Sequence, residues 1–266
     1  RKDIETDGRH AKVSFTSNWE QDAARRDFTI NAIYADIEGR IFDPLNGRED
    51  LKNKLVKFIG NVEERIQEDY LRILRYFRFF LQYSDKPHDQ QVIKSIKKHI
   101  NGINHLSKER IFDELKKILI LNNLYSLFSQ SESKEVILSI FPQFKYHERL
   151  KIFNQLNKNI KIKYDNCLIL ALLIVDKSNN YEYFCHKYKT SNSIKNRLSI
   201  ISQNFENIKN KNFFTKQNIK KQIYILGKGI VLDLLLFSLS INKFKNFDAI
   251  QLVKYIQEKV IKAILN

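Results

Sequence analysis

The segment from Glu68 to Arg78 places carboxylate and guanidinium groups at helical spacing. Asp69 and Arg72 are three residues apart, and Arg75 and Arg78 follow at the same step. On a helix, residues three apart are surface neighbours, so Asp69 and Arg72 can offer acceptors and a rigid fork of donors side by side. Such a pair matches the Watson–Crick edge of a nucleotide base. The alternative interpretation is a ladder of surface salt bridges, which is common at this spacing.

Two motifs upstream favour the nucleotide interpretation. The run Arg25-Arg26-Asp27 continues as F-T-I-N-A, and Asp43 opens the run D-P-L-N-G-R-E-D-L. With E-D-Y-L-R, their order and spacing resemble the class II tRNA nucleotidyltransferases, the CCA-adding enzymes that share a fold with bacterial poly(A) polymerases. The similarity is strong from Arg1 to about Leu119 and weak beyond it.

The resemblance implies a binding site for CTP and ATP. In this family the R-R-D motif helps to hold the ribose and phosphates, and the E-D-x-x-R pair makes Watson–Crick contacts to the incoming base. The implied reaction is attack of the tRNA 3′ hydroxyl on the nucleotide α-phosphate, with release of pyrophosphate. The nucleotide-binding residues implied for this chain are Arg25, Arg26, Asp27, Asp69, Arg72, Arg75 and Arg78.

A helix beginning at Ser107 resembles the last recognisable family motif, L-S-x-E-R. Ser107 is a good N-cap, and Glu109 and Arg110 follow it, with Glu114 a turn later. We expect these side chains to brace the nucleotide-binding helix, because base recognition needs a tightly held geometry. The expected supporting residues are Glu68, Glu109, Arg110 and Glu114.

The sequence shows neither the glycine-rich turn nor the D-x-D strand with which family members hold triphosphate and magnesium. Asp3 and Glu5 have D-x-D spacing, but their context resembles a later family segment, so no metal ligand or catalytic carboxylate is assigned. Phosphoryl transfer depends on metal ions. We therefore expect Mg²⁺ to be held by a head segment outside this sequence. A first residue of Arg and the absence of Met favour a fragment or split-gene half, inactive alone and partnered by a separately encoded head.

A net charge of +16 and a pI near 9.6 predict a polyanionic partner, which the resemblance identifies as the tRNA 3′ end. No apolar run approaches the ~20 residues of a membrane span. Two cysteines fit a reducing compartment, predicted as the cytoplasm, and the six histidines have no metal-ligand spacing. The lysines expected to contact RNA are Lys187, Lys189, Lys209, Lys211, Lys216, Lys220 and Lys221, although a solvated basic face is the alternative for each cluster.

The hydrophobic pattern predicts an α+β fold that is mostly α. Short strands of a nucleotidyltransferase head (residues 1–60) precede an all-helical neck (61–130) and a helical body and tail (131–266). Expected strands cover residues 12–15, 30–36, 40–43 and 56–59. Expected helices cover residues 63–83, 89–100, a segment from 107, 134–140, 150–160, 167–175, 193–208, 216–226, 230–241 and 247–265.

Two alternatives stay open at this point. Poly(A) polymerases share these motifs, although D-P and E-D-Y-L-R-I-L-R are more typical of CCA-adding enzymes. A non-catalytic RNA-binding fragment of such an enzyme would keep the basic body without the activity.

Overall fold

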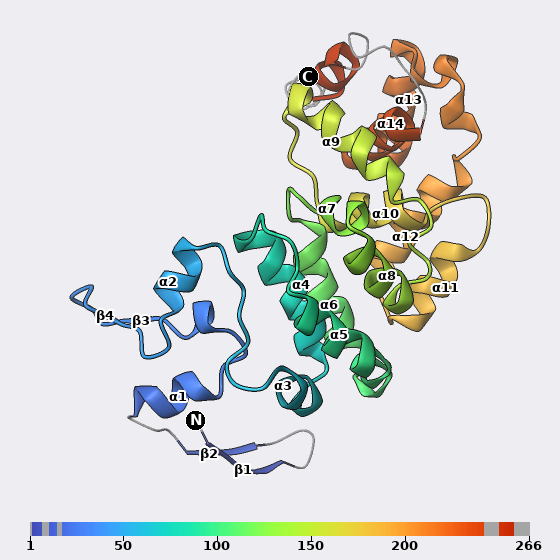
Figure 1. Cartoon of the computed structure of the whole chain (residues 1–266). Helices are drawn as coiled ribbons and strands as arrows, with labels where there is room; N and C mark the ends of the chain where they lie inside the picture. The colour runs from blue at the N-terminus through green and yellow to red at the C-terminus, as the bar shows by residue number, and fades with distance from the viewer. Residues whose placement is uncertain (1, 7–10, 15–17, 242–249, 258–266) are drawn as a thin grey trace. The chain divides into compact units, whose positions relative to one another are not determined.

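The computed structural model of the chain describes residues 2–6, 11–14, 18–241 and 250–257. The chain divides into two compact units, Arg1–Leu106 and Ser107–Asn266. As predicted, the fold is α+β and mostly α-helical (Figure 1). The domain boundaries near residues 60 and 130 remain predictions beside this single division.

Every strand among the described residues lies in the first unit, in two short antiparallel pairs. The strands predicted at 12–15 and 40–43 correspond to β2 and β4. The strand predicted over 30–36 is wrong in its first part, because Thr29–Asn31 forms a 3-10 turn (η1). The strand predicted at 56–59 is reduced to one bridge between Phe28 and Phe58. The strands are β1 Lys2–Thr6, β2 Ala11–Ser14, β3 Tyr34–Ala35 and β4 Ile41–Phe42.

The single helix predicted over 63–83 is wrong, because two helices meet there. Asp69 has extended backbone (φ −154°, ψ 104°), which ends the first helix before the second begins at Leu71. The ring of Tyr70 packs on Gly102, where a Cβ would lie 2.0 Å from a ring carbon. The helices of this unit are α1 Trp19–Ala24, α2 Gly47–Lys52, α3 Val62–Glu68, α4 Leu71–Tyr83 and α5 Gln90–His99, followed by the 3-10 segment η2 Ile100–His105; α1 and α2 were not predicted.

The apolar stripe expected on α4 is buried. Ile73, Leu74 and Phe77 are fully buried, and Leu81 nearly so. The three arginines of α4 are half-buried between these core positions. The prediction that the arginines occupy a face of their own is therefore confirmed.

The second unit is helical throughout its described residues. Its central helix is α10, whose nine residues are all buried apart from the first and which contacts α6, α9, α11, α12 and α14. An all-apolar run of this kind is typical of a helix covered on every side. The helices are α6 Lys108–Leu119, α7 Ser126–Ser129, α8 Ser131–Ile140, α9 Glu148–Ile160, α10 Asn166–Ile174, α11 Asn180–Lys187, α12 Asn192–Gln203, α13 Lys216–Leu226 and α14 Lys228–Ile241, with 3-10 segments η3 Asn207–Lys209 and η4 Lys211–Phe214.

Most predicted helices of this unit are present with longer or shorter ends. The helix predicted over 193–208 ends early at Gln203, and α7 and α11 were not predicted. Of the helix predicted over 247–265, residues 250–257 are helical. The remainder of that prediction lies outside the described residues.

Candidate nucleotide-binding site

Arg25 and Arg26 converge on one carboxylate, that of Asp22. Arg25 Nε lies 2.7 Å from Asp22 Oδ1, and Arg26 Nη2 lies 2.9 Å from Oδ2. The Tyr34 hydroxyl donates to the same Oδ2 at 2.8 Å. Burial alone would raise the pKa of Asp22, but the hydrogen bonds from Arg25, Tyr34 and Arg26 outweigh it and hold that pKa well below its usual range. Asp22 therefore stays charged and keeps both guanidinium groups in place.

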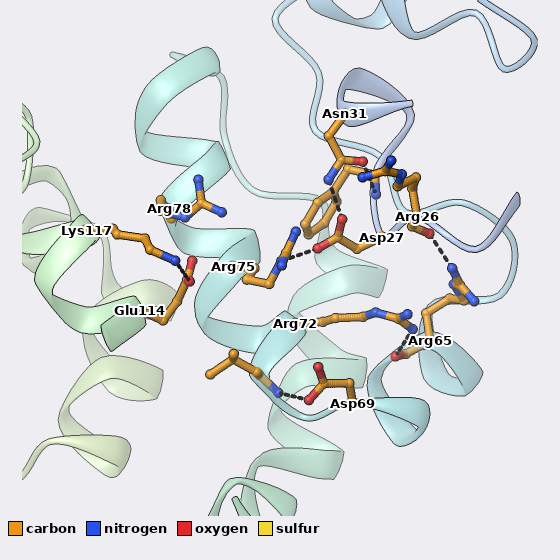
Figure 2. Close-up of polar contacts among 12 residues, drawn as sticks. Arg26, Asp27, Asn31, Arg65, Asp69, Arg72, Arg75, Arg78, Glu114 and Lys117 are labelled. Carbon is orange, nitrogen blue, oxygen red and sulfur yellow. Dashed lines mark hydrogen bonds and ion pairs between the residues drawn. The ribbon is translucent and has the colours of Figure 1, made fainter. Parts of the chain in front are cut away.

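Asp27, the third residue of the R-R-D motif, is buried with only 4% of its surface exposed. Its carboxylate forms an ion pair with Arg75 Nε that is not aligned as a hydrogen bond, and it accepts a hydrogen bond from the Asn31 side chain. Figure 2 shows the carboxylate pointing toward Arg75 of α4. In this conformation Asp27 links the R-R-D loop to α4, and its contact with ribose or phosphate remains a prediction.

Asp69 and Arg72 lie at the break between α3 and α4. The Asp69 side chain accepts a hydrogen bond from the Leu71 amide at 3.1 Å and so caps the first turn of α4. Arg72 Nη1 donates to the carbonyl of Arg65 at 2.7 Å (Figure 2). The same nitrogen donates to Glu68 Oε2 at 2.5 Å. The two side chains still share one junction, although the single-helix geometry first expected for them is wrong.

Glu68 Oε2 binds both Arg72 and Arg65 Nη1, the latter at 2.6 Å, and its support of a nucleotide site remains a prediction. Burial acts to raise the pKa of Glu68, but hydrogen bonds from Arg72 and Arg65 lower it overall. The Glu68 carboxylate is therefore ionised at neutral pH and fixes the guanidinium plane of Arg72.

Arg75 and Arg78 continue along α4, as the spacing predicts. Arg75 is paired with Asp27, whereas the Arg78 guanidinium lies 4.3 Å from the Phe79 ring centre and 3.4 Å from Gln82 Oε1. Both side chains remain half-exposed. They can therefore still reach an anionic ligand, and their role in binding one remains a prediction.

The other expected supporting residues belong to the second unit. Ser107 caps α6 by accepting from the Arg110 amide at 3.3 Å, as expected. Glu114 is 2% exposed and pairs with Lys117 at 3.0 Å, while Glu109 pairs with Lys189 at 3.0 Å. Bracing of the nucleotide-binding helix by Glu109, Arg110 and Glu114 remains a prediction.

The predicted RNA-binding lysines do not share one environment. Lys189 is engaged by Glu109, and Lys209 by Glu206 at 2.9 Å. Lys216, Lys220 and Lys221 are exposed on α13. Lys187 lies 5.1 Å above the Tyr188 ring, and the side chain of Lys211 lies outside the described residues.

Three contributors were missed by sequence reasoning: Asp22, Tyr34 and Arg65. Asp22 precedes Arg25 and Arg26 by three and four residues, a helical pairing distance that could have indicated it. Arg65 precedes the E-D motif by three residues and could have been found in the same way. Tyr34 carries no such signal, because its contact with Asp22 depends on the fold.

Within the described part of the chain, no group of three His, Cys, Asp or Glu side chains is arranged to hold a metal ion. The site carboxylates of Asp22, Asp27 and Glu68 are occupied by arginines. These residues therefore do not fit a magnesium site. A separate finding for the same residues is that no helix is both long and apolar enough to cross a bilayer.

Two parts of the sequence match known protein families, and the chain is similar to curated proteins. Residues 1–57 match the family described as the poly A polymerase head domain, and residues 89–147 match the probable RNA and SrmB-binding site of polymerase A. The mitochondrial CCA tRNA nucleotidyltransferase 1 of Homo sapiens is 46% identical over 162 residues, which cover 60% of this chain and 37% of that protein. The CCA-adding enzyme of Staphylococcus saprophyticus is 31% identical over 233 residues, covering 88% of this chain and 56% of that protein.

Solved structures share the fold. The CCA-adding enzyme of Bacillus stearothermophilus in complex with CTP has a TM-score of 0.64 at 21% identity, over 92% of this chain and 60% of that one. The Thermotoga maritima CCA-adding enzyme complexed with tRNA has a TM-score of 0.62 at 18% identity, over 91% of this chain and 61% of that one. The chain is a relative of the class II tRNA nucleotidyltransferases and poly(A) polymerases, as its motifs indicate. The matched residues span 37% of the length of the human protein and 56% of the length of the Staphylococcus saprophyticus enzyme.

Proposed function

We propose that this chain supplies the nucleotide-selecting part of a tRNA CCA-adding nucleotidyltransferase, with CTP and ATP as substrates and the tRNA 3′ end as acceptor. The observation that carries the proposal is the junction at Asp69 and Arg72, where an acceptor and a donor fork stand beside the R-R-D loop. The names of the relatives, which are CCA-adding enzymes from several organisms, support it.

In this proposal each group has a separate task. Arg25 and Arg26, held by Asp22, bind the phosphates that all nucleoside triphosphates share. Arg72, held by Glu68, donates to the base edge, and Asp69 accepts from it. Pairing with a fixed donor and acceptor rejects bases that leave a buried polar group unpaired.

Mg²⁺ would supply charge neutralisation at the transferring phosphate, as in other phosphoryl transfers. No side chain of the described residues is assigned to it. The cytoplasm stays the predicted compartment, supported by two free cysteines. The mitochondrial names of several relatives make cell fractionation the necessary check.

The test measures transfer of labelled CMP and AMP to a tRNA that lacks its 3′ CCA, with Mg²⁺ present. The chain is assayed alone and with the N-terminal head portion of the Staphylococcus saprophyticus enzyme. We expect CMP and then AMP incorporation only in the mixture. Long adenosine tracts on unrelated RNA would instead identify a poly(A) polymerase, and tRNA binding without any nucleotide transfer or nucleotide discrimination would identify a non-catalytic RNA-binding protein.

A further inference from the structure

Arg65 lies where three parts of the first unit meet. Its side chain is only 12% exposed. One terminal nitrogen, Nη2, donates to the main-chain carbonyls of Ala24, at 3.2 Å, and of Arg26. The other, Nη1, pairs with Glu68 Oε2 at 2.6 Å. Figure 2 shows Arg65 between the R-R-D loop and the junction of α3 with α4.

The contacts continue from Arg65 to Arg72. The Glu68 oxygen that binds Arg65 also accepts from Arg72 Nη1, and the same Nη1 donates to the Arg65 carbonyl. One hydrogen-bonded path therefore runs from the backbone of Arg26 through Arg65 and Glu68 to the guanidinium of Arg72. The two ends of this path are the groups assigned above to the phosphates and to the base.

We propose that Arg65 is a positioning residue that fixes the R-R-D loop relative to the base-reading junction, so that a nucleoside triphosphate meets both at once. The inference rests on the proposed function. It requires the shape of arginine, because one planar fork reaches two carbonyls and a carboxylate in fixed directions. A lysine ammonium is a compact point charge on a flexible chain and cannot hold all three. A cation is also favoured beside carbonyls at the C-terminal end of a helix, where Ala24 lies.

The experiment uses the full chain with Arg65→Lys and the matched control Arg40→Lys. Arg40 is 78% exposed and pairs with Asp36 and Glu38, away from this path. Equilibrium dissociation constants are measured for CTP, ATP, GTP and UTP. Amide hydrogen exchange is followed without nucleotide at Arg26, in the loop, and at Thr29 and Asn31, in the 3-10 turn that follows it. Their N–H groups donate to the carbonyls of Ala23, Lys57 and Phe28, respectively.

We expect Arg65→Lys to raise the exchange rate of these three amides about tenfold, because the charged hydrogen bonds from Arg65 to the Ala24 and Arg26 carbonyls are disrupted. It should weaken all four nucleotides and reduce the preference for CTP and ATP over GTP and UTP by about tenfold. Arg40→Lys should change neither. Glu68→Gln removes the charge that pairs with both Arg65 and Arg72 and should reduce the preference. It should raise loop exchange less than Arg65→Lys does, because the bonds from Arg65 Nη2 to the Ala24 and Arg26 carbonyls remain.

Two results would overturn the inference separately from the proposed function. If the wild-type chain discriminates among nucleotides and Arg65→Lys keeps the same preference, Arg65 is only structural. If loop exchange is unchanged in Arg65→Lys, the path does not hold the loop. A wild-type chain that binds all four nucleotides equally, or none, refutes the proposed function and the positioning role with it.

Discussion

At the scale of single residues, the R-R-D loop is organised by a carboxylate that the motif does not include. Asp22 carries two guanidinium groups and a tyrosine hydroxyl, so its charge matters to the position of both arginines. The like charges of Arg25 and Arg26 repel each other, and the negative charge of the shared Asp22 carboxylate offsets this repulsion. The proposed phosphate-binding geometry therefore depends on Asp22, a residue that is assigned no ligand of its own.

The lowered pKa of Asp22 predicts how the stability of the protein depends on pH. Its folded pKa is lowered from an ordinary value of 3.8, so below about pH 4 the unfolded chain binds a proton that the folded chain does not. This contribution to stability is complete above the unfolded pKa and is lost as the pH falls through the folded one. We expect Asp22→Asn to be less stable than wild type at pH 7 and to lose less stability between pH 4 and pH 2. Urea unfolding at several pH values measures both; parallel pH profiles for the two proteins would contradict it.

The proposed role of Asp69 and Arg72 in reading the base leads to a second prediction at this scale. In the active mixture, Asp69→Ala and Arg72→Ala should lose discrimination among nucleotides, since a recognition group left unpaired costs about 1 to 3 kcal/mol. Arg26→Ala should slow CTP, ATP, GTP and UTP about equally, because its partner is the part common to all four. The double Asp69 and Arg72 variant should cost less than the sum of the singles. Equal slowing of all nucleotides by Asp69→Ala would show that Asp69 acts only as the cap of α4.

At the scale of elements, the break between α3 and α4 is what positions the candidate site. Tyr70 follows Asp69 and packs its ring against Gly102, in the 3-10 segment after α5. Gly102 has no positive φ, so its backbone conformation does not itself require glycine. Glycine is required because the Tyr70 ring lies so close that no Cβ would fit. The position of the junction between α3 and α4 therefore depends on Gly102, near the C-terminal end of the same unit.

Gly102→Ala should therefore displace Tyr70 and disturb Asp69 beside it. Overpacking of this kind typically costs about 1 to 3 kcal/mol. We expect a lower melting temperature and reduced nucleotide discrimination. Gly229→Ala is the matched control, because a Cβ there meets nothing within 4 Å and lies near the start of α14; it should be neutral or slightly stabilising. Wild-type stability in Gly102→Ala would show that Tyr70 can move without cost.

These elements also show how far the sequence can be interpreted. Periodicity located α4 and its buried stripe, because a 3.6-residue pattern persists along the whole helix. The same periodicity wrongly predicted one continuous helix through Asp69, because no Gly or Pro marks the break. The residue on which Tyr70 packs, Gly102, lies far along the chain and gives no local signal. The motif residues were located by their spacing. The partners of those residues, such as Tyr34 for Asp22, depend on tertiary contacts that no local pattern records.

The second unit offers a test of what holds its helices together. Arg197 of α12 makes a bidentate contact with Asp233 of α14, at 2.5 and 2.8 Å, and also binds Asp165 before α10. Asp233 is 5% exposed, whereas the Asp165 side chain is 52% exposed. Asp233→Ala leaves the partly buried Arg197 with only the exposed Asp165 as its partner. Because two hydrogen bonds to a charged group are lost, we expect a loss of about 1 to 3 kcal/mol. Asp165→Asn should lose far less. Chemical denaturation compares the two; equal losses would refute the central place of Asp233.

At the scale of the whole molecule, the net charge of +16 is unevenly distributed along the sequence. Residues 207–232 contain six lysines and no Asp or Glu. Within this stretch α13 buries only Ile219, and its exposed residues include Lys216, Lys220 and Lys221. A polyanion approaching this stretch therefore meets positive charge without competing carboxylates in the same segment.

We predict that the chain binds tRNA with an affinity that falls steeply with salt, because neutralised phosphates release counterions. Changing both Lys220 and Lys221 to Gln should weaken binding and reduce the slope of log K against log salt by about 1.5, at roughly 0.7 to 0.9 for each phosphate that is no longer neutralised. The control changes Lys54 and Lys86 to Gln, two exposed lysines of the first unit, with the same reduction of net charge. If only total charge matters, the two double variants will show equal slopes. A smaller slope for the α13 variant alone identifies α13 as a contact surface, and a wild-type slope near zero would show that the charge of this chain serves solubility and not RNA binding.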